Sequence, residues 1–222
     1  MQFDIITLFP EIIDTYCKYG IISRGIRENH IRVNSIDLRP FGIGKHQKVD
    51  DEAFGGGVGL IFKVEPIFQA LESIKRKNKS KVFITSASGK QWNQNFAENL
   101  KTQEQIIVIC GRYEGYDERI NNFIDDEICV GDYILTGGEI GALTIIDSVS
   151  RLIPNILKKE ETHNVESFQN NLLEYPQYTR PQEFNNWKVP EILISGNHGE
   201  VEKWRNEKAL EKTKKNRPDL LE

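Results

Sequence analysis

The stretch QIIVICGRYEG, residues 105–115, decides the fold of this chain. Residues 105–110 form a short β-branched run, which predicts a strand, and Gly111 follows that run directly. In an open α/β sheet, ligands bind in the crevice beyond the carboxyl ends of the strands. Glycine lets the backbone approach a ligand closely and adopt positive φ angles. The stretch therefore predicts a strand that leads into a glycine-containing loop at a binding crevice.

The alternation of strand and helix extends outward on both sides of this stretch. Further β-branched runs predict strands over residues 2–8, 31–38, 81–86 and 127–131. Helical patterns separate these runs, over residues 10–19, 64–77, 94–100 and 139–152, and a polar helical stretch follows Tyr116. Such alternation is typical of an α/β fold with a mostly parallel sheet and helices on both faces.

Two further glycine loops follow predicted strands, SASG at residues 86–89 and VGDYILTGG at residues 130–138. Together with residues 110–115 they stand at three consecutive strand ends, so we expect them to converge on one pocket. Each loop taken alone also fits an ordinary turn, because glycine is a common turn residue. None of the loops matches the dinucleotide-binding fingerprint or the Walker phosphate loop. The pocket therefore lacks the familiar nucleotide-binding motifs.

The composition is that of a globular protein. Of 222 residues, 38% are hydrophobic and 28% are charged, which argues against a disordered, collagen-like or membrane-embedded chain. The sequence has no span of about 18 apolar residues, and its first residues do not resemble a secretory signal. Three widely spaced cysteines favour free thiols in a reducing compartment. We expect a cytoplasmic protein with no membrane partner.

The charges are unevenly distributed along the chain. The 29 basic residues and 33 acidic residues give a formal net charge of −4. Basic residues nevertheless dominate residues 18–48 and 202–217, whereas acidic residues dominate residues 114–139. Two interpretations stay open at this point: solvated helix faces, or a split footprint that binds phosphate groups.

The composition changes after Pro154. Residues 158–173 are polar and charged over most of their length, which predicts a mobile linker. The helical patterns that follow predict a small all-helical domain over residues 174–222, and the α/β domain occupies residues 1–157.

Seven long motifs, in order along nearly the whole chain, carry a resemblance to a known family. They are LFPE (8–11), VDDEAFGGGVG (49–59), CGRYEGYDER (110–119), GDYILTGGE (131–139), DSVSRLIP (147–154), LLEYPQYTRP (172–181) and SGNHGEVEKWR (195–205). With these motifs the chain resembles the bacterial tRNA (guanine-N1)-methyltransferases, which belong to the SPOUT class. The resemblance implies methyl transfer from S-adenosylmethionine to N1 of the guanosine at position 37 of tRNA, next to the anticodon.

The resemblance also implies features that generic topology rules would not predict. The α/β domain would contain a trefoil knot at its C-terminal side, and a homodimer would build each active site from both subunits. The cofactor would lie among the knot loops and be bound mainly by backbone groups. Matching the motifs gives these cofactor-binding residues: Ile84, Ser86, Gly89, Gly111, Tyr113, Glu114, Val130, Gly131, Asp132, Tyr133, Ile134, Leu135, Gly137 and Gly138.

Two residues receive catalytic roles from the resemblance. Attack by guanine N1 needs a carboxylate that removes the N1 proton and a cation that stabilises charge on O6. The motifs give Arg151 as the cation and Glu166 as the base, although the family carries Asp at that place. Glu160, Glu161 and a mechanism without a base are the alternatives. A non-catalytic tRNA-binding relic and an unrelated nucleotide-using α/β enzyme are the rival functions.

The residues for tRNA recognition divide into two groups, because phosphate contacts position an RNA and base contacts specify it. Candidates for phosphate contact are Arg24, Lys45, Arg180, Lys203 and Arg205. The loop around Asp50 and Gly56 would read the bases together with the linker. Asn197 and His198 open the last predicted helix, where capping is the alternative to RNA contact. The histidines show no metal-ligand spacing, and the residues do not indicate whether Mg²⁺ takes part.

Overall fold

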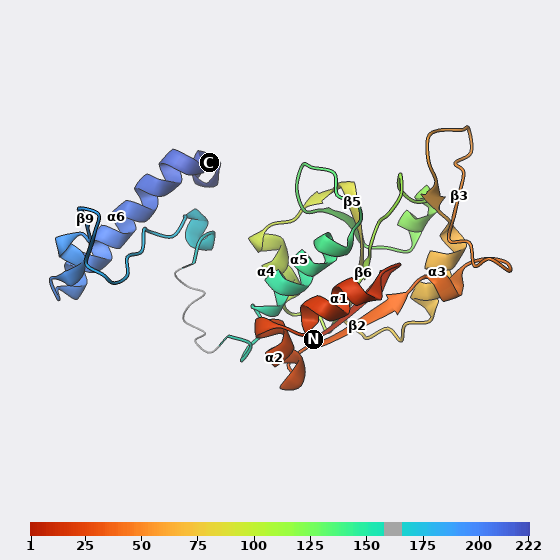
Figure 1. Ribbon diagram of the computed structural model, residues 1–222, viewed down its shortest axis with the longest axis horizontal. Helices are drawn as coiled ribbons and strands as arrows, with labels where there is room; N and C mark the ends of the chain where they lie inside the picture. The colour runs from red at the N-terminus through yellow and green to blue at the C-terminus, as the bar shows by residue number, and fades with distance from the viewer. Residues whose placement is uncertain (158–165) are drawn as a thin grey trace. The chain divides into compact units, whose positions relative to one another are not determined.

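A five-stranded, entirely parallel sheet forms the core of one part of the computed structural model, which describes residues 1–157 and 166–222 (Figure 1). The chain divides into two compact units, Met1–Lys158 and Lys159–Glu222, and the sheet belongs to the first. Its strands in spatial order are β2 (Arg32–Asp37), β1 (Gln2–Thr7), β6 (Gln105–Ile109), β5 (Ser80–Gln91) and β7 (Asp126–Cys129). The predicted α/β class with a parallel sheet is confirmed.

Helices cover both faces of this sheet because its central strands are apolar on both sides. On β6, Ile106 and Val108 face one hydrophobic core, whereas Ile107 and Ile109 face the other. The first core packs against α1 (Pro10–Cys17), α2 (Gly20–Arg27), α4 (Gln94–Leu100) and α5 (Glu139–Ser150). The second packs against α3 (Val64–Glu72) and the 3₁₀ helices η1 (Arg39–Phe41) and η2 (Glu118–Asn122).

Helix α3 is shorter than the pattern predicts, because it ends at Glu72 and not near Lys77. Gln105 at the start of β6 is fully buried, and its Oε1 accepts a hydrogen bond of 2.9 Å from the backbone N–H of Lys77. Its Nε2 donates to the carbonyl of Lys75 at 3.3 Å. The Gln105 side chain therefore bonds backbone groups of Lys75 and Lys77 that would otherwise form the hydrogen bonds of further turns of α3.

Strand β5 contains the first glycine loop within its length. It pairs with β7 in two registers, so that Ile128 faces Thr85 in one and Lys90 in the other. Residues 86–89 leave the sheet between these pairings, and a Cβ on Gly89 would lie 2.5 Å from the backbone N of Ile128. Only glycine permits that approach. The expectation that SASG stands at a strand end is corrected to a bulge inside a strand.

A small hairpin-like sheet projects beside the main one. Its strands are β3 (Asp50–Asp51) and β4 (Ile61–Phe62), which pair antiparallel and are joined by the glycine-rich loop of residues 52–60. The backbone N–H of Phe62 donates to the carbonyl of Gly115 at 3.0 Å, and the N–H of Glu114 donates to the carbonyl of Leu60 at 3.1 Å. The base of this loop is therefore bonded to the loop that follows β6.

The second unit is not all-helical, so that prediction is wrong. Residues 166–222 contain one long helix, α6 (His198–Asn216), and a hairpin of β8 (Glu183–Phe184) and β9 (Trp187–Lys188). They also contain the 3₁₀ segments η4 (Gln169–Asn171), η5 (Glu191–Ile194) and η6 (Pro218–Leu221). Asn185 and Asn186 connect the two strands with φ angles of 51° and 64°. Asparagine tolerates the left-handed conformation that a two-residue hairpin turn requires, which explains the hairpin.

Half of the predicted linker can be placed. Residues 158–165 lie outside the described residues, whereas residues 166–173 belong to the second unit. The backbone N–H of Leu173 donates to Oγ1 of Thr213 on α6 at 2.8 Å. Among the helices that the structure describes, none has the length and apolar character needed to cross a lipid bilayer.

Candidate active site

Three loops enclose a cavity of about 390 Å³ at the carboxyl edge of the sheet. They are the bulge of β5, the loop after β6 and the loop between β7 and α5. Most of the predicted cofactor residues line it: Ser86, Gly111, Tyr113, Glu114, Val130, Gly131, Tyr133, Ile134, Leu135, Gly137 and Gly138. Ile84, Gly89 and Asp132 do not line it. The structure therefore brings together three segments that are far apart in the sequence.

Backbone groups hold these loops in contact with one another. Oγ1 of Thr85 accepts a hydrogen bond of 2.9 Å from the N–H of Gly111, and the N–H of Gly138 donates to the carbonyl of Gly111 at 2.8 Å. A Cβ on Gly138 would lie 1.9 Å from Oγ1 of Thr85, so no side chain fits there. Thr85 was not predicted as a site residue, because in the sequence it is only part of the end of a β-branched run.

A buried ion pair between Glu139 and Arg112 holds the same loops in place. Glu139, which is 2% exposed, accepts hydrogen bonds from Oγ1 of Thr7 at 2.7 Å and from Nη2 of Arg112 at 2.9 Å. Nη1 of Arg112 donates to the carbonyl of Thr136 at 3.1 Å. Because a buried carboxylate needs such partners, Glu139 ties the end of β1 to two of the pocket loops. Neither Glu139 nor Arg112 was predicted as a site residue from the sequence.

Glu127 organises the opposite wall of the cavity. Its Oε2 accepts a hydrogen bond of 2.6 Å from Oγ of Ser88. Burial opposes its ionisation, but hydrogen bonds from Ser88, Ser86 and Tyr116 outweigh burial and lower the pKa of the Glu127 carboxyl. The bulge of β5 is thus attached to a carboxylate on β7.

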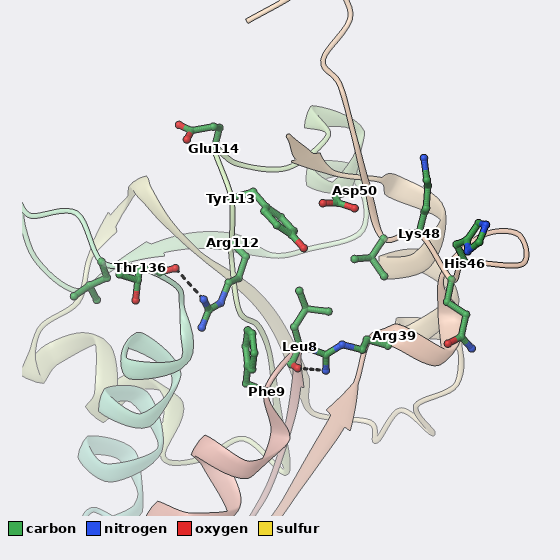
Figure 2. A pocket seen from close by; sticks show the side chains of 13 residues that line it. Leu8, Phe9, Arg39, His46, Lys48, Asp50, Arg112, Tyr113, Glu114 and Thr136 are labelled. Carbon is green, nitrogen blue, oxygen red and sulfur yellow. Dashed lines mark hydrogen bonds between the residues drawn. The ribbon is translucent and has the colours of Figure 1, made fainter. Parts of the chain in front are cut away.

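A second cavity, of about 580 Å³, adjoins the first and shares Arg112, Tyr113, Glu114, Leu135 and Thr136 with it. Figure 2 shows Arg112 above the ring of Phe9 and Asp50 facing Tyr113 across the pocket. The guanidinium carbon of Arg112 lies 4.3 Å from the centre of the Phe9 ring, and that of Arg39 lies 5.2 Å from it.

The second cavity is suited to an anionic ligand that also carries hydrogen-bond donors. Its cationic lining comes from Arg39, Lys48 and Arg112, and its acidic lining comes from Asp50 and Glu114. Burial, followed by the Asp50 charge and hydrogen bond, raises the pKa of the Tyr113 hydroxyl. Like a free tyrosine, whose pKa is about 10, Tyr113 is protonated at neutral pH and can donate a hydrogen bond. A nucleotide offers both its phosphate and its base edge to such a lining.

The loop of residues 52–60 borders this region and exposes apolar side chains. Phe54 is fully exposed and Val58 is 92% exposed. Gly56 has a φ of +82°, and a Cβ on Gly59 would lie 2.5 Å from Cγ of Glu114. The loop therefore packs tightly against a residue of the first cavity while its tip remains uncovered.

The two predicted catalytic residues belong to different units. Arg151 is the C-cap residue of α5 in the first unit, where a cation also complements the helix dipole. Glu166 begins the described part of the second unit. The alternative bases Glu160 and Glu161 lie outside the described residues.

The candidates for tRNA contact in the first unit lie in different settings. Lys45 is exposed, Asp50 lines the second cavity, and Gly56 lies in the exposed loop. Arg24 donates a hydrogen bond to the carbonyl of Ile156, which gives it a structural role as well.

In the second unit the candidates lie on or near α6. Arg180 and Lys203 are exposed. Asn197 caps α6, since its side chain accepts a hydrogen bond from the N–H of Glu200 at 3.3 Å, and His198 is the first helical residue. The guanidinium of Arg205 stacks 4.9 Å from the Tyr175 ring centre, so packing also explains this residue.

No group of three or more histidine, cysteine or acidic side chains gathers into a metal-binding arrangement within residues 1–157 and 166–222. We therefore assign no ligands to Mg²⁺.

Comparisons with known proteins agree on one family. A family model described as tRNA (Guanine-1)-methyltransferase TrmD matches residues 1–222. A tRNA (guanine-N(1)-)-methyltransferase of Mycoplasma mycoides is 49% identical, over 100% of this chain and 92% of the relative. Proteins of the same name from a Sulfurihydrogenibium species and from Trichodesmium erythraeum are 48% and 47% identical, over 100% of this chain and 88% and 98% of those relatives.

Proposed function

The chain belongs to the tRNA (guanine-1)-methyltransferase family, and we propose that it transfers the methyl group of S-adenosylmethionine to N1 of the guanosine at position 37 of tRNA. The observation that carries the proposal is the cavity formed by three loops, in which Thr85, Gly111 and Gly138 hold one another without room for a side chain. Such a wall lets the backbone of the loops approach a ligand closely.

The residues of this cavity fit the proposed methyl donor. Its apolar lining, with Val130, Ile134 and Leu135, suits an adenine ring, and the Glu114 carboxylate suits the positive charges of the donor. The donor supplies an electrophilic methyl group on a sulfonium. The task of the protein is to bind it, exclude water and orient the methyl group toward guanine N1.

The second cavity is the proposed binding site of the target nucleotide. Arg39, Lys48 and Arg112 provide cations for its phosphates, and Asp50 provides an acceptor for the N–H groups on the base edge. Because the two cavities share Tyr113 and Glu114, the base and the methyl donor would meet at that shared wall.

Two side chains complete the proposed chemistry. The Glu166 carboxylate accepts the proton that guanine N1 loses, and the Arg151 guanidinium stabilises the negative charge that develops on O6. Glu166 and Arg151 belong to different units of the chain. The resemblance to the SPOUT class implies that each active site takes residues from both subunits, so the base would come from the partner.

We therefore propose a cytoplasmic homodimer with its active sites at the subunit interface. An exposed apolar surface on α1 and α5 supports this assembly. Ile12 and Tyr16, one helical turn apart on α1, are each 40% exposed, and Ile140 on α5 is 59% exposed. The Tyr16 hydroxyl donates to Asp147 on α5 at 2.5 Å, so the two helices meet along this surface.

We also propose that the first unit is knotted, as in SPOUT proteins. The support is the course of the chain after β7, which returns to Gly111 beyond β6 and to Thr85 on β5 before α5 begins.

The proposed base is tested with Glu166→Gln, which keeps the size of the side chain and removes its ability to accept a proton. Single-turnover methyl transfer to an unmodified tRNA transcript should slow by about 100-fold or more, since general bases contribute about 10²–10⁴-fold. The affinity for S-adenosylmethionine, measured by calorimetry, should stay unchanged.

Glu191→Gln is the matched control, since Glu191 is an exposed acid of the same unit. Unchanged turnover in the Glu166 variant would remove this residue from the mechanism. A wild-type protein that binds tRNA but forms no product would instead identify a relic.

A further inference from the structure

A second basic site lies at the opposite edge of the sheet from the proposed active site. A hollow of about 570 Å³ is bordered there by Arg32 on β2 and by Lys75, Arg76 and Lys77 in the loop after α3. These four residues, all exposed, are called the basic hollow below. The hollow also contains Gln2 and Asp4 from the start of β1.

A buried polar network fixes the shape of the basic hollow. The Asp4 carboxylate, 2% exposed, accepts hydrogen bonds from Nδ2 of Asn34 at 2.7 Å and from Nε2 of Gln105 at 2.8 Å. Gln2 donates to the same carboxylate at 2.8 Å. Gln105 in turn holds the backbone of Lys75 and Lys77. The three consecutive cations therefore project from a loop whose backbone is anchored to the core.

The positive charge of the basic hollow is not neutralised by ion pairs in the described parts of the chain. Across residues 1–157 and 166–222, no carboxylate lies within 4 Å of the side-chain nitrogens of Arg32, Lys75, Arg76 or Lys77. By contrast, nearby Lys81 pairs with Asp125 at 2.6 Å. The charge of the cluster also acts on the N-terminus: burial, followed by the charge of Lys77, lowers the pKa of the Met1 amino group.

The size and position of the basic hollow indicate which anion it takes. A space of about 570 Å³ is in the range of sites for extended ligands and exceeds what a lone phosphate fills. The hollow extends along the sheet as far as Asp4 and Ile36, but its cations lie at the amino end. Arg32 begins the six residues of β2, which span about 20 Å toward the carboxyl edge at roughly 3.3 Å per residue. A nucleotide whose base is in the active site is therefore too far away to reach it.

We propose that the basic hollow binds backbone phosphates of the tRNA substrate outside its anticodon stem-loop. This inference rests on the proposed function, because it takes tRNA as the substrate. Contacts of this kind position an RNA without reading its sequence, and they make its affinity depend on salt. The hollow would thus contribute to affinity for a whole tRNA and not to the methyl-transfer step.

The test compares a full-length tRNA transcript with its anticodon stem-loop in filter-binding assays over a range of salt concentrations. The variant K75A/R76A/K77A should bind full-length tRNA about tenfold more weakly, and the slope of log affinity against log salt should fall by about two to three. Its affinity for the stem-loop and its single-turnover rate at saturating tRNA should equal those of the wild type.

Two matched variants separate the site from net charge and from folding. K81A/K101A/R119A removes the same charge from cations that pair with Asp125, Glu98 and Asp117, and it should bind full-length tRNA like the wild type. K75R/R76K/K77R keeps the charge and should keep the affinity. Thermal melting checks that each variant is folded.

Several results would overturn the inference. The inference would be wrong if K75A/R76A/K77A and K81A/K101A/R119A bound full-length tRNA with equal affinity. It would also be wrong if K75A/R76A/K77A lost as much affinity for the stem-loop as for the full-length tRNA. Calorimetry with tripolyphosphate tests a free anion as the source of the phosphate groups: binding that is lost in K75A/R76A/K77A while tRNA affinity is kept would assign the hollow to that anion. Failure of the proposed function itself is distinct, because the wild type would then form no methylated product.

Discussion

At the scale of single residues, the decisive groups of the candidate site are those that support others. Neither Glu139 nor Thr85 was predicted as a site residue, yet their side chains hold the loops together. Sequence reasoning could not find them, because the burial of a polar side chain depends on which distant segments fold against it. Tyr113 and Glu114 were predicted because they match the family motif at residues 110–119.

Tyr16 provides a prediction on pH dependence. Its hydrogen bond to Asp147, followed by burial, raises the pKa of the Tyr16 hydroxyl from 10.0 to about 12. The folded state therefore favours the protonated tyrosine, and this stabilisation is complete below pH 10 and is lost as the pH rises from 10 to 12. Tyr16→Phe has no hydroxyl to ionise, so its free energy of unfolding should not show this loss.

Urea unfolding of both proteins at several pH values measures the effect. The difference in free energy of unfolding between wild type and Tyr16→Phe should shrink between pH 10 and pH 12. A difference that stays constant across this interval would show that the hydrogen bond to Asp147 does not control the titration.

At the scale of elements, the sequence predicted the order of strands and helices well. The helix over residues 94–100 and the strand that begins at Gln105 coincide with α4 and β6. These elements follow from local patterns of apolar residues, which a sequence displays. The early end of α3 and the bulge in β5 do not follow from local patterns. Each depends on a partner far along the chain, which is Gln105 for α3 and Ile128 for β5.

Gly138 tests how closely the loops of the first cavity must approach. Its φ of −81° suits any residue, so the obstacle to a side chain is the Thr85 hydroxyl 1.9 Å from the added Cβ. Overpacking of this kind costs about 1–3 kcal/mol. Gly138→Ala should therefore weaken binding of S-adenosylmethionine by about 10-fold to 100-fold in calorimetry.

Gly199→Ala is the control for this change. A Cβ there would meet only Oδ1 of Asn197, at 3.7 Å, and Gly199 lies within α6. It should leave donor affinity unchanged. If both variants bind the donor like the wild type, the contact between Gly138 and Thr85 does not shape the pocket.

At the scale of the whole molecule, the proposed dimer explains why α1 and α5 leave apolar side chains uncovered. Ile140→Glu would place a charge in the interface, where it has no partner. Sedimentation equilibrium should then show a monomer. Turnover on tRNA should fall to background, because in the proposed dimer each active site is built from both subunits.

Ile43→Glu serves as the comparison, since Ile43 is 40% exposed in the first unit but lies in a loop away from these helices. It should remain dimeric. A monomeric wild type, or a dimeric Ile140→Glu protein with full turnover, would contradict the proposed assembly.

The bonds that join Leu60 to Glu114 and Phe62 to Gly115 have a kinetic consequence. They join the base of the loop at residues 52–60 to a wall that the proposed nucleotide and donor cavities share, so a ligand that enters either cavity would leave the other already shaped. Neither substrate then has to arrive first, and the geometry favours random-order addition over an obligatory sequence.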